Sequence, residues 1–163
     1  MEISLEKKRI LVIDDDEGVL KSMMRLLEFE GYAVDTAKSG REAVEKSKLN
    51  FYNLALIDIR LPDMQGTELL SAMQDTVPRT VKIILTGFPS TGNAIDAVNK
   101  GADGYVTKPV IDTDAFLQKI KEHLRKQEGW DQFSEEKVAE FVKTRIKRQE
   151  AKENKQAETN ANQ

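Results

Sequence analysis

Several apolar runs of this sequence end in side chains that could carry out phosphate chemistry. One run leads into three consecutive aspartates, a second ends in an aspartate, a third in a threonine and a fourth in a lysine. These side chains are Asp14, Asp15, Asp16, Asp58, Thr86 and Lys108. Carboxylates that lie close together repel one another unless a hard cation or an ammonium group balances them, and Mg²⁺ prefers such oxygen ligands. A carboxylate nucleophile beside Mg²⁺, a lysine and a hydroxyl group is what phosphoryl transfer requires.

These side chains can meet only if strands carry them to a common edge. Short β-branched apolar runs predict five strands, at Arg9–Asp14, Tyr32–Ala37, Leu54–Asp58, Val81–Thr86 and Gly104–Lys108. The stretches between the runs carry apolar residues at helical spacing. This alternation predicts a doubly wound α/β domain with a parallel sheet, in which ligands bind outside the carboxyl ends of the strands. The sequence therefore predicts an acidic pocket at that edge.

The composition limits the class of protein. The chain has 163 residues, of which 39% are hydrophobic and 33% charged, and it has no cysteine. This length suits one domain, and no run approaches the roughly 18 consecutive apolar residues of a membrane span. The lack of cysteine excludes disulfides, thiolate catalysis and cysteine zinc sites. The same lack fits a reducing cytoplasm. With 25 basic and 28 acidic side chains the net charge is -3, so we expect neither a membrane nor a nucleic acid partner.

Four motifs resemble those of one known family. The motifs are ILVIDDDEGV at 10–19, LALIDIRLPDMQG at 54–66, IILTG at 83–87 and GADGYVTKP at 101–109. Together, in this order and at these intervals, they resemble the receiver domain of two-component response regulators, over residues 9–126. The resemblance implies a flavodoxin-like sheet of five parallel strands in the order 2-1-3-4-5. It also implies a phosphoacceptor with limited self-phosphorylation and self-dephosphorylation activity, and not a turnover enzyme.

The resemblance implies a role for each acidic residue. Asp58 accepts a phosphoryl group from the phosphohistidine of a histidine kinase, from a phosphotransfer protein or from a small phosphodonor. Asp14 and Asp15 are the acidic pair that holds Mg²⁺ together with Asp58, and Asp15 is the more direct ligand of the two. The backbone carbonyl of Arg60 supplies a further protein oxygen. Arg60 itself stands where members of the family often have methionine.

The resemblance also implies a conformational switch. Thr86 moves towards the phosphoryl group, Lys108 contacts it, and the rotamer of Tyr105 follows Thr86. Pro109 follows a cis peptide bond. The face that changes is built from the fourth helix, the fifth strand and the fifth helix, and it is a candidate surface for protein partners or for a homodimer. Taken alone, a tyrosine on a strand also fits simple packing, so the switch role of Tyr105 depends on the rest of the pattern.

Two other functions remain open on the sequence. A phosphatase of the haloacid dehalogenase type also uses an Asp-x-Asp after its first strand, which Asp14 and Asp16 could mimic, but that family has a Gly-Thr soon after, where this chain has Glu17, Gly18 and Val19. A phosphorylation-independent interaction module with the same fold is the second alternative. Asp16 and Glu17 also suit the start of a helix, where acidic residues cap free amides.

The composition changes after Gln127, which divides the chain into a receiver at 1–127 and an extension at 128–163. An amphipathic pattern predicts a helix over Ser134–Glu150, with Val138, Phe141, Val142 and Ile146 on one face. We expect this face to pack against the receiver or against the same helix of a second subunit, because an isolated helix of this length is marginal in water. Beyond Arg148 we expect disorder. The extension has no helix-turn-helix pattern, so we expect no direct DNA binding.

Overall fold

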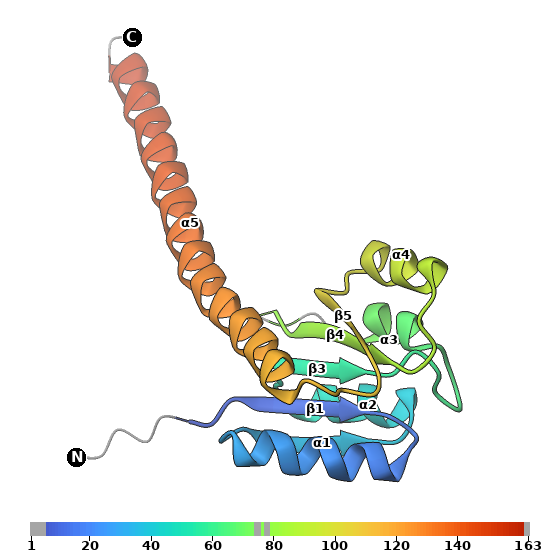
Figure 1. The fold of residues 1–163 in the computed structure, drawn as a ribbon. Coiled ribbons are helices and arrows are strands. Elements are labelled where there is room, and N and C mark those ends of the chain that lie inside the picture. Colours follow the sequence, from blue (N-terminus) through green and yellow to red (C-terminus); the bar gives the residue numbers. More distant parts are fainter. Residues whose placement is uncertain (1–5, 74–75, 77–78, 162–163) are drawn as a thin grey trace, which may run out of the picture. The chain divides into compact units, whose positions relative to one another are not determined.

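The computed structural model describes residues 6–73, 76 and 79–161, and for residues 130–138 it describes the backbone alone. Five parallel strands form one sheet in the order β2-β1-β3-β4-β5 (Figure 1), which confirms the predicted fold class. The strands are β1 (Arg9–Ile13), β2 (Ala33–Ala37), β3 (Leu54–Ile57), β4 (Val81–Thr86) and β5 (Gly104–Thr107).

Three predicted strands end one residue earlier than expected. Asp14, Asp58 and Lys108 each lie directly after a strand instead of at its last position. The backbone amide of each of these residues still donates to a carbonyl of the neighbouring strand, and the chain then turns into the loop above the sheet. The polar side chains therefore stand on the loops at the carboxyl edge, where the chain has room to bring them together.

The helices cover both faces of the sheet. They are α1 (Glu17–Phe29), α2 (Gly40–Leu49), α3 (Gly66–Ala72), α4 (Thr91–Asn99) and α5 (Thr113–Ala161). On β1, Ile10 and Val12 pack in one core with α1 and the first part of α5, whereas Leu11 and Ile13 pack in a second core with α2, α3 and α4. Strands covered on both faces are apolar on both, as the continuous apolar runs of the sequence indicate.

The amino ends of the helices are capped by short polar side chains. Oδ1 of Asp16 accepts hydrogen bonds from the backbone amides of Gly18 and Val19 at the start of α1. Ser39 caps α2 in the same way through the amide of Glu42. Such caps satisfy amides that have no partner within the helix. Asp16 therefore caps helix α1, one of the two roles that the sequence allowed for it.

By its internal contacts the chain divides into two units, Met1–Gln127 and Glu128–Gln163. In the first unit, the side chain of Gln127 is 7% exposed, and its Nε2 donates to the backbone carbonyls of Asn53 at 2.9 Å and Arg79 at 2.7 Å. These two hydrogen bonds anchor the last residue of the first unit to the loops at the amino edge of the sheet.

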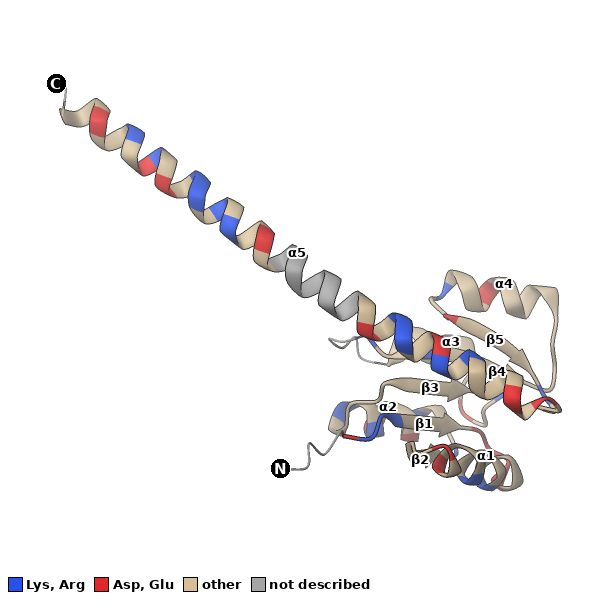
Figure 2. Cartoon of the chain, turned by 60° about the vertical axis from the view of Figure 1, so that its left-hand side comes forward, with Lys and Arg blue, Asp and Glu red and all other residues tan. Residues whose placement is uncertain are grey.

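The second unit is more helical than expected. We predicted a helix at Ser134–Glu150 followed by disorder, but residues 128–161 all belong to α5. Lys, Glu, Gln and Ala dominate residues 149–161, and all four have high helix propensity, so the backbone is helical there without an apolar core. Figure 2 shows acidic and basic residues interspersed along this part of α5. Side chains at 139–161 are exposed, including Phe141, Val142 and Ile146, whereas the side chain of Val138 lies outside the described residues.

Among the described residues, no helix is both long enough and apolar enough to cross a membrane.

Candidate functional site

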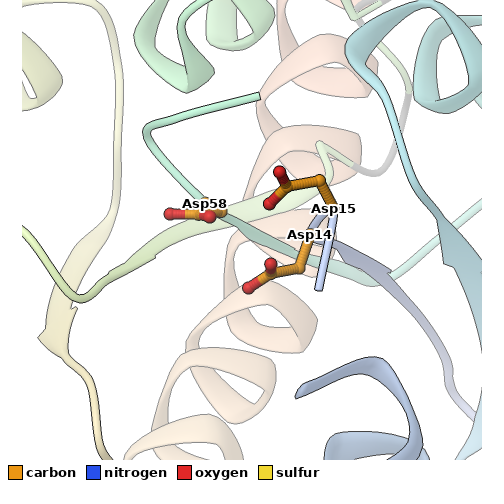
Figure 3. Close-up of side chains that lie close together, drawn as sticks. All are labelled: Asp14, Asp15 and Asp58. Carbon is orange, nitrogen blue, oxygen red and sulfur yellow. The ribbon is translucent and has the colours of Figure 1, made fainter. Parts of the chain in front are cut away.

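Three aspartates gather at the carboxyl edge of the sheet. Asp14 and Asp15 follow β1, and Asp58 follows β3, the neighbouring strand. One carboxylate oxygen from each lies within 4.8 Å of the other two (Figure 3). Asp14 is 2% exposed and Asp58 is 6% exposed, whereas Asp15 is exposed. The cluster thus combines two buried carboxylates with one that faces solvent.

Lys108 balances part of this negative charge. Its Nζ lies 2.7 Å from Oδ2 of Asp14 and 3.5 Å from Oδ2 of Asp58. The Lys108 amide donates to the carbonyl of Thr86 at 2.7 Å, which fixes the loop after β5 beside the end of β4. Burial by itself lowers the pKa of Lys108, but the hydrogen bond to Asp14 and the charges of Asp14 and Asp58 outweigh it, so the pKa is raised. The side chain therefore remains an ammonium group at neutral pH.

The two buried aspartates differ in how their oxygens are used. Oδ1 of Asp14 accepts the Asp16 amide at 2.9 Å, and Oδ2 of Asp14 accepts from Lys108, so both of its oxygens are engaged. Oδ1 of Asp58 is buried and has no hydrogen-bond partner among the described residues. A buried polar atom without a partner is costly and uncommon in native proteins, and it calls for an explanation such as a catalytic role or an ion.

The environment of Asp58 also changes its acidity. Burial, followed by the charge of Asp14, raises the pKa of Asp58, while Lys108 and the Arg60 amide act in the opposite direction. Buried carboxylates beside like charge hold their protons more tightly for these two reasons. A cation placed against Asp58 would favour its ionised form.

The donor set fits a hard divalent cation. The cluster offers carboxylate oxygens only, Oδ1 of Asp58 has no partner in the part of the chain that the structure describes, and Asp15 is open to solvent. Mg²⁺ takes oxygen ligands, keeps several waters, and is commonly held by one or two carboxylates together with a phosphate. Asp14, Asp15 and Asp58 are the residues that would hold it, and the resemblance to the receiver family implies the Arg60 carbonyl as a further ligand.

The other predicted site residues make the following contacts. Thr86 is fully buried, and its Oγ1 accepts the Phe88 amide at 3.1 Å, a bond within its own loop. Tyr105 is half-buried beside the second core, and its hydroxyl is buried without a partner among the described residues. The guanidinium carbon of Arg60 lies 3.9 Å from the centroid of the Phe88 ring. The Lys108–Pro109 peptide bond is cis.

One contact of this region was missed at the level of sequence. Asp63, in the loop after β3, accepts hydrogen bonds from the first two backbone amides of α2. The Pro62-Asp63 pair signals a turn, but a turn signal does not indicate which distant amides the carboxylate will meet.

The comparisons with known proteins settle the family. A profile of the response regulator receiver domain matches residues 10–121. The chain belongs to the response regulator receiver family. Receiver domains are the modules of two-component systems that interact with histidine kinases or phosphotransfer proteins. The acidic cluster of this receiver lies at the carboxyl ends of β1 and β3.

Curated relatives match about three quarters of this chain. The uncharacterized transcriptional regulatory protein YkoG of Bacillus subtilis is 33% identical over 121 residues, which are 74% of this chain and 53% of YkoG. The cell cycle response regulator CtrA of Brucella ovis is 32% identical over 121 residues, again 74% of this chain and 52% of CtrA. The chain thus spans about half the length of the curated relatives it matches.

A solved structure shares the same fold over almost its whole length. The CheY-like receiver domain protein of Methanospirillum hungatei is 46% identical, with a TM-score of 0.71, and the match covers 76% of this chain and 98% of that one.

Proposed function

We propose that this receiver accepts a phosphoryl group on Asp58 in a Mg²⁺-dependent reaction and signals to protein partners through a conformational change. The donor is a histidine kinase, a phosphotransfer protein or a small phosphodonor. The observation that carries the proposal is the free, buried Oδ1 of Asp58, set beside two carboxylates and the ammonium group of Lys108. Asp14 has no such free oxygen, which favours Asp58 as the nucleophile.

The chemistry follows from these contacts. An ionised oxygen of Asp58 attacks the phosphorus atom, the bond from phosphorus to the donor nitrogen breaks, and the leaving imidazole keeps the electron pair and takes up a proton. Nζ of Lys108 lies 3.5 Å from Oδ2 of Asp58 and places positive charge beside the carboxylate that attacks. When bound by Asp14, Asp15, Asp58 and the Arg60 carbonyl, Mg²⁺ would neutralise charge that develops on the phosphoryl oxygens.

The signal depends on Thr86 and Tyr105. In the structure the Thr86 hydroxyl oxygen accepts a hydrogen bond from the Phe88 amide. A phosphoryl oxygen that accepts a hydrogen bond from this hydroxyl would draw the Thr86 side chain away from that amide. The vacated space admits Tyr105, whose hydroxyl has no partner to lose among the described residues. The affected face carries exposed Ile95 and Val98 on α4, which suit a protein partner or a second copy of the chain. Residues 134–150 are the alternative surface for a homodimer.

The dehalogenase-type phosphatase is less well supported than phosphoacceptance. That mechanism needs Asp14 as nucleophile and Asp16 as the acid or base that assists it. Both oxygens of Asp14 are engaged, and Oδ1 of Asp16 caps α1. An interaction module that needs no phosphorylation would leave the free Asp58 oxygen without a purpose.

Labelling of the full chain tests the proposal. The protein is incubated with acetyl phosphate and Mg²⁺, the acyl phosphate is trapped by reduction, and the modified residue is mapped by mass spectrometry. We expect label on Asp58, none after Asp58→Asn, and none without a divalent cation. Asp16→Asn is the matched control, because it removes a carboxylate near the cluster that the proposal does not use. Label on Asp14 would replace the proposal with the phosphatase mechanism, and no label at all would favour the interaction module.

A further inference from the structure

The carboxylate of Asp63 attaches the tip of the loop between β3 and α3 to helix α2. Oδ1 of Asp63 accepts the Gly40 amide at 2.9 Å, and Oδ2 accepts the Arg41 amide at 2.8 Å. These amides open α2, where the positive end of the helix dipole favours an anion. The Arg41 and Gly40 amides also lower the pKa of Asp63, so the carboxylate is ionised at neutral pH. Asp63 thus ties its loop to a helix on another part of the fold.

A second contact brings the same two segments together. A Cβ atom at Gly40 would lie 2.4 Å from both Cγ and Sδ of Met64. Met64 therefore occupies the space that a side chain at position 40 would fill. The loop packs directly on the backbone of α2, and the two hydrogen bonds of Asp63 are made where that packing is closest.

The two ends of the loop meet next to Asp58. The Gly66 amide donates to the carbonyl of Ile59 at 2.6 Å, and a Cβ at Gly66 would lie 2.0 Å from the carbonyl oxygen of Asp58. Between these ends, Arg60 and Gln65 form an antiparallel bridge. Asp58 and Arg60 therefore belong to a short, closed hairpin whose tip is attached to α2.

We propose that Asp63 is a positioning residue for the acidic cluster. By tying the hairpin to α2, it holds the Asp58 carboxylate and the Arg60 carbonyl in the arrangement that the cation and the phosphoryl group need. The inference rests on the proposed function. Without the Asp63 carboxylate the hairpin loses two hydrogen bonds to α2 and is held less firmly there, while Asp14, Asp58 and Lys108 keep their chemistry. The expected defect is weaker cation binding and not a lost nucleophile.

The test compares two caps of the same helix. Ser39 also caps α2, but its Oγ accepts the Glu42 amide, a bond that stays within the start of that helix. Ser39→Ala and Asp63→Ala should both lower the melting temperature of the full chain. Only Asp63→Ala should weaken Mg²⁺ binding, by about tenfold in calorimetry, as removal of groups that orient metal ligands commonly does. Asp63→Asn, which keeps one carbonyl oxygen as acceptor, should weaken it less.

Phosphoryl uptake from acetyl phosphate supplies a second measurement. The Mg²⁺ concentration for half-maximal uptake should rise in Asp63→Ala by the same factor as the dissociation constant, while the rate at saturating Mg²⁺ is retained. Equal Mg²⁺ affinity in Asp63→Ala and Ser39→Ala overturns the inference and leaves the proposed function intact. Wild-type protein that binds no Mg²⁺ overturns both. Should Asp63→Ala fail to fold, Asp63→Asn against Ser39→Ala decides by the same criterion.

Discussion

The two parts of helix α5 obtain their structure from different sources. Up to Gln127 the helix contributes four buried side chains to the core, namely Phe116, Leu117, Ile120 and Leu124. From residue 139 to 161 its side chains are exposed. The first part depends on tertiary packing, whereas the second depends on residues with high helix propensity. The acidic cluster and Lys108 come from the ends of three strands, so their side chains meet only if packing holds those strands in place. The candidate site therefore lies in the packed part of the molecule.

The largest expected effect separates two phenylalanines on this one helix. Phe116 is 5% exposed and Phe141 is 63% exposed. Phe116→Ala should reduce the free energy of unfolding by about 3–5 kcal/mol, because it leaves a cavity in the core. Phe141→Ala should change it by less than about 0.5 kcal/mol. Urea denaturation of the full chain measures both. A comparable loss at both positions would mean that Phe141 is covered in solution, as a homodimer through residues 134–150 requires.

Two glycines make a second contrast. A Cβ at Gly66 would lie 2.0 Å from the Asp58 carbonyl oxygen, whereas one at Gly129 would have no described atom within 4 Å. Gly66→Ala should cost about 3 kcal/mol and reduce phosphoryl uptake, because the backbone of Asp58 must shift. Gly129→Ala should instead raise helix content, since alanine is favoured over glycine in a helix by about 1 kcal/mol. Circular dichroism melting curves test both, and a Gly66→Ala protein that is as stable and active as wild type would contradict the close approach.

Two glutamines test the hydrogen bonding of the two parts. Gln127→Ala removes both bonds to the carbonyls of Asn53 and Arg79 and should cost about 1–3 kcal/mol. Gln149 is exposed, so Gln149→Ala should have no measurable effect on unfolding. Equal stability of the two variants would show that Gln127 does not anchor the end of the first unit.

The smallest expected effect is a pH-dependent gain in the stability of the Asp58→Asn variant. Burial and the charge of Asp14 raise the pKa of Asp58, so the folded state binds this proton more tightly than the unfolded state. Stability therefore falls as pH rises from the unfolded pKa through the folded pKa. Asp58→Asn should raise the melting temperature by a few degrees at pH 7 without Mg²⁺, and the gain should vanish in acid. Glu153→Gln, on the exposed part of α5, should match wild type at every pH. A destabilised Asp58→Asn would contradict this account of the carboxyl.

Much of the fold and the cluster follows from the sequence because it depends on local patterns. Continuous apolar runs predict strands that are buried on both faces, and parallel strands place Asp14, Asp58 and Lys108 at one edge whatever the loops do. The contact of Asp63 with Gly40 and Arg41 could not be predicted, because it joins a loop that looks like an ordinary turn to the start of a helix that looks equally ordinary. Geometry of this kind arises only when tertiary packing brings distant backbone amides to a carboxylate.

In the extension, the sequence prediction failed because it neglected a local property, the helix propensity of the residues. We expected disorder beyond Arg148 because the sequence there has no apolar residue larger than alanine. The same residues are good helix formers, and α5 continues through them to Ala161. The lack of large apolar residues shows that this segment forms no packed core, but it does not show that the segment is not helical.

Mapping of the acyl phosphate tests the central claim most directly. Full-length protein is treated with acetyl phosphate and Mg²⁺, trapped and digested. The account predicts one modified residue, Asp58, and complete loss of label in Asp58→Asn. Stable label on any other aspartate, or undiminished label in that variant, would contradict it.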